Sequence, residues 1–478
     1  MHDEFAKQGV AASASPLVLA DGMLDYLDVF PHACAEQIVS KVFPQIGFLG
    51  TQDYEVDEAA VRDLFRSTIS KLRSRQGPDG GFRFWATSSQ PADFPSAYIV
   101  HFFSDAAELG LPVPRDMLDS GLSFMRQIAA EQVRSLPDAR LRAYAVYILT
   151  RNGVVTTNYL TNLHEYLNRE FDDAWRSDLA ASYMAASYAL MQQPQVADRL
   201  IDGYEFGRGD GVSSDFDTRL GRDAQHLYLL ARHFPDRLDD VDSDEFQRLI
   251  DPVMKNQFNT LSSAYTILAL GAYTRAVIQQ ADLQVGISQV TLNETSLIAE
   301  PGYFARANVT NDNRDVRING AAGRDIYYVL SQTGFDAEVQ QSALAEGLEI
   351  QRAYLNADGD AVTSATIGDE LTVRLRIRST GRPRSNVAVV DLLPGGFEVS
   401  ADSVHRGQGG WTSDYTDVRE DRVVVYGTFQ DRVTEIRYRV KLTSAGSFAV
   451  PSAFASSMYD RSVQARSAPD RFEVLPVQ

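Results

Sequence analysis

The stretch that decides how this sequence is interpreted is Phe30-Pro31-His32-Ala33-Cys34-Ala35-Glu36-Gln37, which holds the one cysteine of the 478 residues. If the backbone turns tightly here, the sulfur of Cys34 reaches the side-chain carbonyl of Gln37, ammonia leaves, and an internal thioester forms. Because thiolate is a good leaving group, the acyl carbon of Gln37 would then be open to a nucleophile from another molecule. The alternative is a buried structural cysteine near a helix start, since free cysteine is among the most buried residue types.

Water would hydrolyse a thioester, so the bond has to be buried until it is used. Three aromatic residues near Cys34 in the sequence, Tyr26, Phe30 and Phe43, are expected to help to bury it. A single cysteine also excludes an internal disulfide, so cysteine usage does not settle the redox compartment.

The region around this stretch, residues 16–278, is predicted to be helical throughout. Val61, Leu64, Phe65, Ile69 and Leu72 fall on one helical face, and the breaker Gln76 to Gly81 ends that helix. Similar apolar helical segments then recur roughly every 40 residues, centred on Tyr98, Tyr144, Tyr183, Tyr228 and Tyr265. This period predicts stacked helical hairpins, arranged either as a solenoid or as a closed ring.

After Gln280 the apolar pattern changes to that of β-strands. Val285, Ile287 and Val290 lie in a first strand, and Tyr327 to Leu330 form another. From about residue 346 the alternation sharpens, with turns at Pro394-Gly395-Gly396 and Ser444-Ala445-Gly446; the alternating residues are Leu371, Val373, Leu375, Ile377, Ile436, Tyr438, Val440 and Leu442. Many short strands separated by turns predict a β-sandwich.

The charge balance and the N-terminus narrow the possible functions. With 64 acidic and 45 basic residues the formal net charge is −19, which disfavours nucleic acid as a partner. No run approaches the roughly 18 apolar residues that span a bilayer. Residues 1–15 lack a basic start and an apolar stretch, so we expect neither a signal peptide nor an anchor there, but a disordered extension.

The motif around Cys34 resembles the Tyr-Pro-x-Gly-Cys-x-Glu-Gln stretch that opens the helical toroid of alpha-2-macroglobulins and complement proteins. Gln76 to Phe82 is similar to the glycine-rich turn of that toroid, and Ser96 to Val100 to the helix that follows it. Val389 to Phe397 and Ala453 to Tyr459 resemble the last macroglobulin domain of the bacterial members. The similarities follow the family's order, so the chain resembles the C-terminal part of a bacterial alpha-2-macroglobulin.

This resemblance implies a multidomain chain, first α and then β. An extension over residues 1–15 precedes an α/α toroid thioester domain at 16–278. A CUB-like β segment follows at 279–345, as the second half of a domain that wraps around the toroid in sequence. A C-terminal macroglobulin β-sandwich of the receptor-binding type occupies 346–478.

The function implied by the resemblance is that of a broad-range peptidase trap, a single-use endopeptidase inhibitor rather than an enzyme. A protease cuts a bait region, the molecule rearranges, and the thioester captures a lysine amine of the protease. The expected partners are proteases and the N-terminal macroglobulin and bait domains, in the same protein or a companion chain. No cofactor or metal is expected, and the location would be periplasmic, with anchoring through an N-terminal lipoprotein signal that is missing from this sequence.

In such proteins the last domain shields the thioester. Met458 and Tyr459 are therefore expected to act as a lid, together with Tyr26 and Phe30. An ordinary apolar pair in a loop is the alternative interpretation of Met458 and Tyr459.

Three features depart from the family pattern. Ala33 stands where the family has glycine, which would be costly if that backbone needs a positive φ. Phe30 replaces the usual tyrosine, and His32, the third departure, occupies a variable position. The stretch from Ala129 to Pro137 lacks the histidine with which complement proteins transfer the acyl group to hydroxyls, so amines are the expected targets. His101 lies elsewhere on its helix and is interpreted as a structural histidine.

Two other functions remain open. One is a cysteine hydrolase using Cys34 and His32, although residues two apart rarely face each other and no further catalytic motif accompanies them. The other is a non-covalent binding module of the same fold with a decayed thioester. A terpenoid-cyclase site lacks its Asp-rich metal motif, because Asp172-Asp173 and Asp239-Asp240 are interpreted as solvated helix ends.

Overall fold

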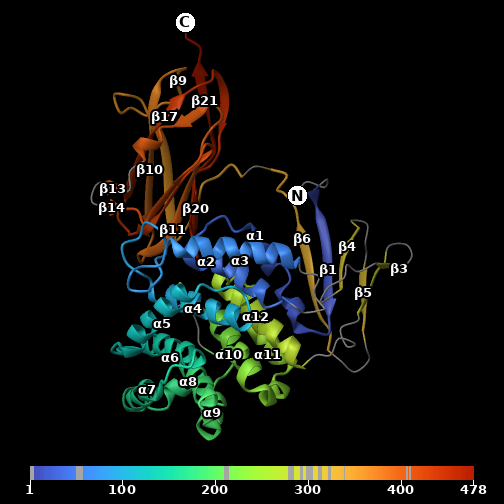
Figure 1. The fold of residues 1–478 in the computed structure, drawn as a ribbon. Helices are drawn as coiled ribbons and strands as arrows, with labels where there is room; N and C mark the ends of the chain where they lie inside the picture. The colour runs from blue at the N-terminus through green and yellow to red at the C-terminus, as the bar shows by residue number, and fades with distance from the viewer. Residues whose placement is uncertain are drawn as a thin grey trace. The chain divides into compact units, whose positions relative to one another are not determined.

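The computed structural model describes residues 5–49, 57–208, 215–277, 285–290, 294–297, 305–310, 315–320, 325–338, 340–404, 407–408 and 411–477 (Figure 1). The chain divides between Phe335 and Asp336 into two compact units, which we describe one at a time. Among the described residues, no helix has the length and apolar character that crossing a membrane requires.

The first unit is mainly helical. Its α-helices are α1 (Met23–Val29), α2 (Ala35–Ile46), α3 (Glu58–Arg73), α4 (Asp93–Glu108), α5 (Arg115–Ala130), α6 (Leu136–Arg151), α7 (Thr157–Glu170), α8 (Leu179–Leu190), α9 (Pro194–Ile201), α10 (Arg219–His233), α11 (Ser243–Met254) and α12 (Thr260–Val277). In the described part of this unit they are accompanied by the 3-10 helices η2 (Pro16–Ala20), η3 (Ala174–Ser177) and η4 (Pro235–Asp240).

The even-numbered helices form a closed inner ring. Each of α2, α4, α6, α8, α10 and α12 contacts the next, and α12 returns to contact α2. The odd-numbered helices α3 to α11 pack outside them. Of the two arrangements left open by the sequence, the ring is therefore the correct one, and the predicted α/α toroid is confirmed.

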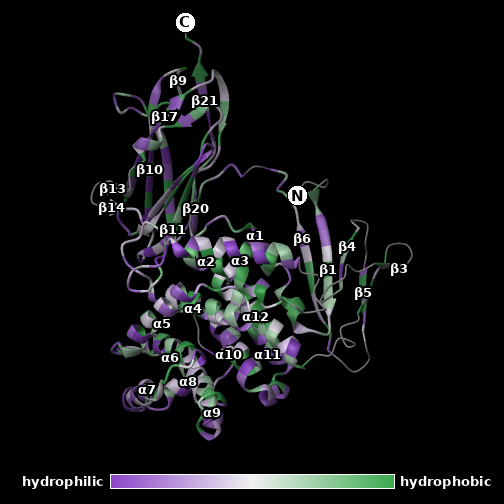
Figure 2. Cartoon of the chain, viewed as in Figure 1, coloured by the Kyte–Doolittle hydropathy of each residue, from purple (hydrophilic) through white to green (hydrophobic). Residues whose placement is uncertain are grey.

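The apolar pattern explains which helices lie inside. α8 is buried along Leu179 to Tyr188 and α12 along Thr260 to Thr274, so both are surrounded by protein on all sides. The outer helix α3 buries a single stripe, as Figure 2 shows in its alternating colours: Val61, Phe65, Thr68, Ile69 and Leu72.

The repeated tyrosines meet at the centre of this ring. They lie on α4, α6, α8, α10 and α12, and each is nearly inaccessible to solvent: Tyr98, Tyr144, Tyr183, Tyr228 and Tyr265. The hydroxyls of Tyr144 and Tyr265 are 2.8 Å apart, and the rings of Tyr144 and Tyr183 stack at 4.7 Å. The sequence repeat thus corresponds to one inner helix per repeat, each of which supplies a phenol to a shared polar core.

Two small antiparallel sheets complete the first unit. Their orders are β4-β1-β6 and β3-β2-β5. The strands are β1 (Lys7–Ser13), β2 (Gly286–Val290), β3 (Glu294–Leu297), β4 (Ala305–Val309), β5 (Asp315–Asn319) and β6 (Tyr327–Thr333). The predicted strands at Ile287 and at Tyr327 to Leu330 are confirmed.

The expectation of a disordered N-terminal extension was wrong. Residues 7–13 form β1, the central strand of its sheet, with β4 on one side and β6 on the other. Val10, Ala11 and Ala12 are fully buried, and the hydroxyl of Ser15 lies 2.6 Å from that of Thr274 on α12. Residues 7–15 are therefore held in place by β4 and β6, which follow α12 in the chain, and by the contact of Ser15 with α12 itself.

The second unit is a β-sandwich with two principal sheets, ordered β12-β17-β10-β8 and β15-β16-β11-β19-β20-β7. Its strands are β7 (Leu344–Glu346), β8 (Leu348–Leu355), β9 (Ser364–Thr366), β10 (Glu370–Ser379), β11 (Arg384–Leu392), β12 (Phe397–Val399), β13 (Gly407–Gln408), β14 (Trp411–Thr412), β15 (Tyr415–Val418), β16 (Arg422–Phe429), β17 (Thr434–Leu442), β18 (Gly446–Val450), β19 (Phe454–Ser457), β20 (Gln464–Arg466) and β21 (Asp470–Leu475), with the 3-10 helix η6 (Ala401–Ser403).

The predicted alternation in the sandwich is confirmed in register as well as in burial. Val373 pairs with Tyr438 and Leu375 with Ile436, and all four are buried. The sandwich begins before the predicted boundary at residue 346, since β7 already pairs with β20.

Candidate functional site

Cys34 occupies the N-cap position of α2, directly before the first helical turn. Its sulfur accepts a hydrogen bond from the backbone N–H of Gln37 at 3.4 Å, and its own N–H donates to Oε1 of Gln37 at 3.2 Å. This reciprocal pattern is a capping box in which the two side chains fold toward one helix end. The structure therefore brings together the two residues predicted to react.

Both side chains are withdrawn from water. Cys34 is fully buried, and Gln37 is only 4% exposed. Among the described residues, Nε2 of Gln37 is a buried nitrogen without a hydrogen-bond partner. Leaving a buried polar group unsatisfied is costly, and loss of this nitrogen as ammonia would remove that cost.

The backbone before Cys34 is held from two sides. Arg75 donates to the carbonyl oxygens of Ala33 at 2.8 Å and Phe84 at 3.1 Å, and the Ala35 N–H donates to the Phe84 carbonyl at 2.9 Å. Ala33 is not among the described non-glycine residues with positive φ. The backbone conformation shown here therefore does not require glycine at position 33.

Of the three aromatic residues predicted to shield Cys34, Tyr26 and Phe30 contact each other in the segment before Cys34, and Phe43 packs elsewhere. Tyr26 packs edge-on against Phe30 at 5.4 Å and Phe258 at 5.2 Å, and the His32 ring lies 5.4 Å from Phe30. Phe43 instead packs inside the toroid against Tyr98, His101 and Phe102. Phe258, which was not predicted from the sequence, joins from the segment just before α12.

Glu36 adds a buried carboxylate beside the pair. It is fully buried, and its Oε2 lies 3.9 Å from the sulfur of Cys34. The Thr260 hydroxyl on α12 is 3.1 Å from Oε1 and 3.0 Å from Oε2, and the Ser40 hydroxyl also donates to Oε1. Ser40 is in turn 3.1 Å from the Tyr98 hydroxyl. Glu36 belongs to the sequence motif, but its contact with Thr260 could not be predicted, because Thr260 lies far away in the chain.

Comparison with known proteins places this chain in a family. Residues 347–461 match the family model described as "Bacterial Alpha-2-macroglobulin MG10 domain". The chain is 34% identical over 509 residues to the "Alpha-2-macroglobulin homolog" of Yersinia pestis, covering 98% of this chain. The chain belongs to the bacterial alpha-2-macroglobulin family. It spans only about a quarter of that relative, 25% of its length.

Solved alpha-2-macroglobulins share the fold across nearly the whole chain. The native Escherichia coli protein from domain MG7 to the C-terminus has a TM-score of 0.78, with 18% identity, 99% of this chain covered and 78% of that one. The Salmonella protein reacted with methylamine has a TM-score of 0.79, with 18% identity, 99% of this chain covered and 32% of that one. The architecture is thus that of the family's C-terminal region.

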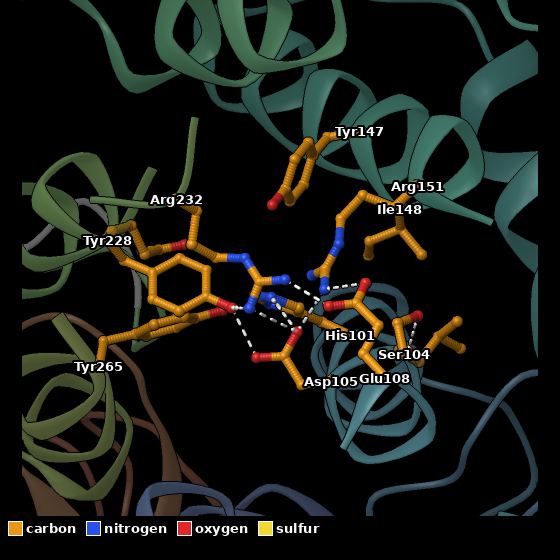
Figure 3. Close-up of polar contacts among 12 residues, drawn as sticks. His101, Ser104, Asp105, Glu108, Tyr147, Ile148, Arg151, Tyr228, Arg232 and Tyr265 are labelled. Atoms are coloured by element: carbon orange, nitrogen blue, oxygen red, sulfur yellow. Dashed lines mark hydrogen bonds and ion pairs between the residues drawn. The ribbon is translucent and has the colours of Figure 1, made fainter. Parts of the chain in front are cut away.

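His101 in this alpha-2-macroglobulin chain has structural contacts, as predicted. Its Nδ1 lies 2.8 Å from the Tyr144 hydroxyl. Its Nε2 lies 3.6 Å from Oδ1 of Asp105, as Figure 3 shows. Burial lowers the pKa of His101 to about 3, with Arg151 and Arg232 acting in the same direction against the opposing effect of Asp105. His101 is therefore neutral at physiological pH and belongs to the polar core of the toroid.

Met458 and Tyr459, the residues predicted to act as a lid, lie in the second unit. Met458 follows β19, and its N–H donates to the Asn386 carbonyl within the second unit at 2.9 Å. The lid role of Met458 and Tyr459 remains a prediction. The segment between α5 and α6, where complement proteins carry their histidine, holds Glu131 to Ser135.

Proposed function

We propose that this chain is the covalent capture part of a bacterial peptidase inhibitor, in which Cys34 and Gln37 form an internal thioester that lysine amines of proteases attack. The observation that supports it most is the reciprocal capping contact of these two buried side chains. The reaction uses each thioester once, so the protein is an inhibitor and not an enzyme.

The trap as a whole needs more than this chain. We propose that bait and further macroglobulin domains, in the full-length protein or a companion chain, supply the trigger that exposes the thioester. We also propose that the protein works in the periplasm and is anchored through a lipoprotein signal. Amines are proposed as targets in preference to hydroxyls, because residues 131–135 supply no histidine for acyl transfer.

The test is the intact mass of the purified native chain. An intact thioester makes the chain lighter by one ammonia than its sequence, and methylamine, with which the Salmonella protein was reacted, should add and release one thiol. Cys34→Ala should restore the full mass and prevent methylamine addition.

Three outcomes would decide against the proposal. A native chain of full mass, with a thiol that labels at once, would leave the non-covalent binding module. Turnover of an acyl substrate that Cys34→Ala abolishes would indicate a hydrolase. Mass loss that persists in Gln37→Ala would place the reaction elsewhere.

Replacing Ala33 with glycine should not increase the yield of thioester. Since Ala33 does not adopt a positive φ, glycine relieves no strain and only adds flexibility to the unfolded chain, which costs about 0.5–1 kcal/mol. The intact masses of the variant and the native chain should agree, and urea unfolding should give the small loss. A clear gain in thioester would show that alanine does hinder the reaction.

A further inference from the structure

Glu36 stands out because it is a fully buried carboxylate that contacts the reacting sulfur. Its Oε2 is 3.9 Å from Sγ of Cys34; Glu36 lies in the first turn of α2, and Cys34 is the N-cap of that helix. A carboxylate at this depth has to be stabilised by its surroundings. Its position beside the one atom that must lose a proton points to a chemical role.

We propose that Glu36 is the general base that makes the thioester and the general acid that completes its opening. This inference rests on the proposed function, since it assigns a proton carrier to the same Cys34–Gln37 reaction. It concerns a step that the Cys34–Gln37 geometry alone does not explain, namely where the thiol proton goes inside a site closed to water.

Hydrogen bonds hold the carboxyl group of Glu36 in place beside the sulfur of Cys34. The hydroxyls of Thr260 and Ser40 donate to its oxygens, and an ionised carboxylate accepts such bonds better than a neutral acid does. Its place in the first turn of α2 adds the favourable field of a helix N-terminus. The titratable group that faces it from α4 is Tyr98, reached through Ser40.

In the forming direction, Oε2 of Glu36 takes the proton from Sγ of Cys34. The thiolate attacks Cδ of Gln37, the C–S bond forms, and the bond from Cδ to Nε2 breaks. The proton on Glu36 passes to Nε2, so that ammonia leaves and Glu36 is again a carboxylate. No oxidant or further reactant is needed.

In the opening direction, the nitrogen of an incoming amine attacks Cδ of Gln37 and the C–S bond breaks. Glu36 takes one proton from that nitrogen and passes it to the sulfur of Cys34. The products are an amide at Gln37 and a free thiol at Cys34, with every proton accounted for.

The experiment compares the native chain with Glu36→Gln, which keeps the size of the side chain and removes the base. Each is produced as unfolded chain in which Gln37 is still an intact amide and is then refolded from denaturant under reducing conditions at several pH values, and loss of ammonia is followed by intact mass. General bases accelerate proton transfer about 10²- to 10⁴-fold, so the variant should react at least about 100-fold more slowly near pH 6. Its rate should then rise about tenfold per pH unit, because thiolate has to form without help below the thiol pKa of about 8.5.

The pH dependence separates a chemical role from a structural one. A residue that only positions Cys34 would slow the reaction equally at every pH, and that result would overturn the inference. Glu36→Asp, which keeps a carboxylate, should recover part of the rate near pH 6. Equal rates for Glu36→Gln and the native chain would also overturn it.

Two further outcomes keep the proposals distinguishable. If Glu36→Gln does not recover its helical circular dichroism, the native chain alone still decides, because a base predicts a rate nearly independent of pH between about 6 and 8. A tenfold rise per unit in the native chain would overturn the role of Glu36 and leave the thioester intact. A native chain that never becomes lighter would instead overturn the proposed function, and the role of Glu36 with it.

Discussion

Replacing Asp105 with alanine is expected to lower the free energy of unfolding of the helical unit by about 3–5 kcal/mol, the cost of breaking a buried ion pair. Asp105 is a residue of α4 and is 6% exposed. Its carboxylate accepts hydrogen bonds from Nη2 of Arg151 on α6 at 2.6 Å and from the Tyr228 hydroxyl on α10 at 2.5 Å (Figure 3). Burial opposes its ionisation, yet Arg151, His101, Arg232 and the Tyr228 hydroxyl hold the pKa of Asp105 below its usual range.

The penalty arises from what the substitution leaves behind. The Arg151 side chain is 2% exposed and already has one nitrogen, Nη1, without a hydrogen-bond partner among the described residues. Once Asp105 is replaced, the ion-pair partner that Arg151 keeps among the described residues is the half-exposed Glu108. A buried guanidinium with half of its partners removed is unfavourable.

Urea unfolding followed by helical circular dichroism measures this effect, because the second unit contributes strands and almost no helix. Asp116→Ala is the matched control. Asp116 pairs with Arg73 at 2.6 Å, but the side chains are 66% and 52% exposed, so the loss should stay within about 1 kcal/mol. Equal losses for the two variants would show that the buried network does not hold the ring together.

The contacts of Asp105 also separate what the sequence predicts about the ring from what it does not. The period of Tyr98, Tyr144, Tyr183, Tyr228 and Tyr265 predicted one helical hairpin per repeat, because each inner helix needs the same apolar face. It could not predict that α12 returns to α2, since a repeat describes neighbours and not closure. Nor could it pair Asp105 with Arg151 and Tyr228, whose partnership exists only after the ring closes.

The N-terminal strand was missed for a different reason. Gly9, Ala11, Ala12 and Ser13 have little intrinsic preference for strands, so the local sequence gives no signal for β1. The strand forms because it pairs on both sides with β4 and β6, which lie about three hundred residues later in the chain. Non-local pairing of this kind is not visible in a short window of sequence.

The reactive pair was the most predictable part of the site. The spacing from Cys34 to Gln37 equals that from an N-cap to the third helical residue, so a helix starting at Ala35 suffices to bring both side chains together. The contact of Glu36 with Thr260 depends instead on α12 packing against α2. Local geometry was therefore predictable, and the environment that makes it chemically useful was not.

Acidification from about pH 6.5 to 4.5 is expected to destabilise the helical unit by about 5 kcal/mol. His101 and His226 are buried and His233 is partly buried, and burial lowers the pKa of each to about 3. An unfolded histidine titrates near 6.5, so below that pH the unfolded chain binds protons that the folded chain does not. Stability is then lost as pH falls, by about 1.4 kcal/mol per unit for each histidine.

Asp223 acts in the opposite direction, which gives the test its control. Burial raises the pKa of Asp223 to about 6, so the folded chain takes up this proton before the unfolded chain does and regains about 1.4 kcal/mol per unit between about pH 6 and 4. His226→Gln should reduce the acid loss to about 3 kcal/mol, whereas Asp223→Asn should increase it to about 7 kcal/mol. Urea unfolding at several pH values measures both slopes, and slopes that change in the same direction for the two variants would refute this account of acid sensitivity.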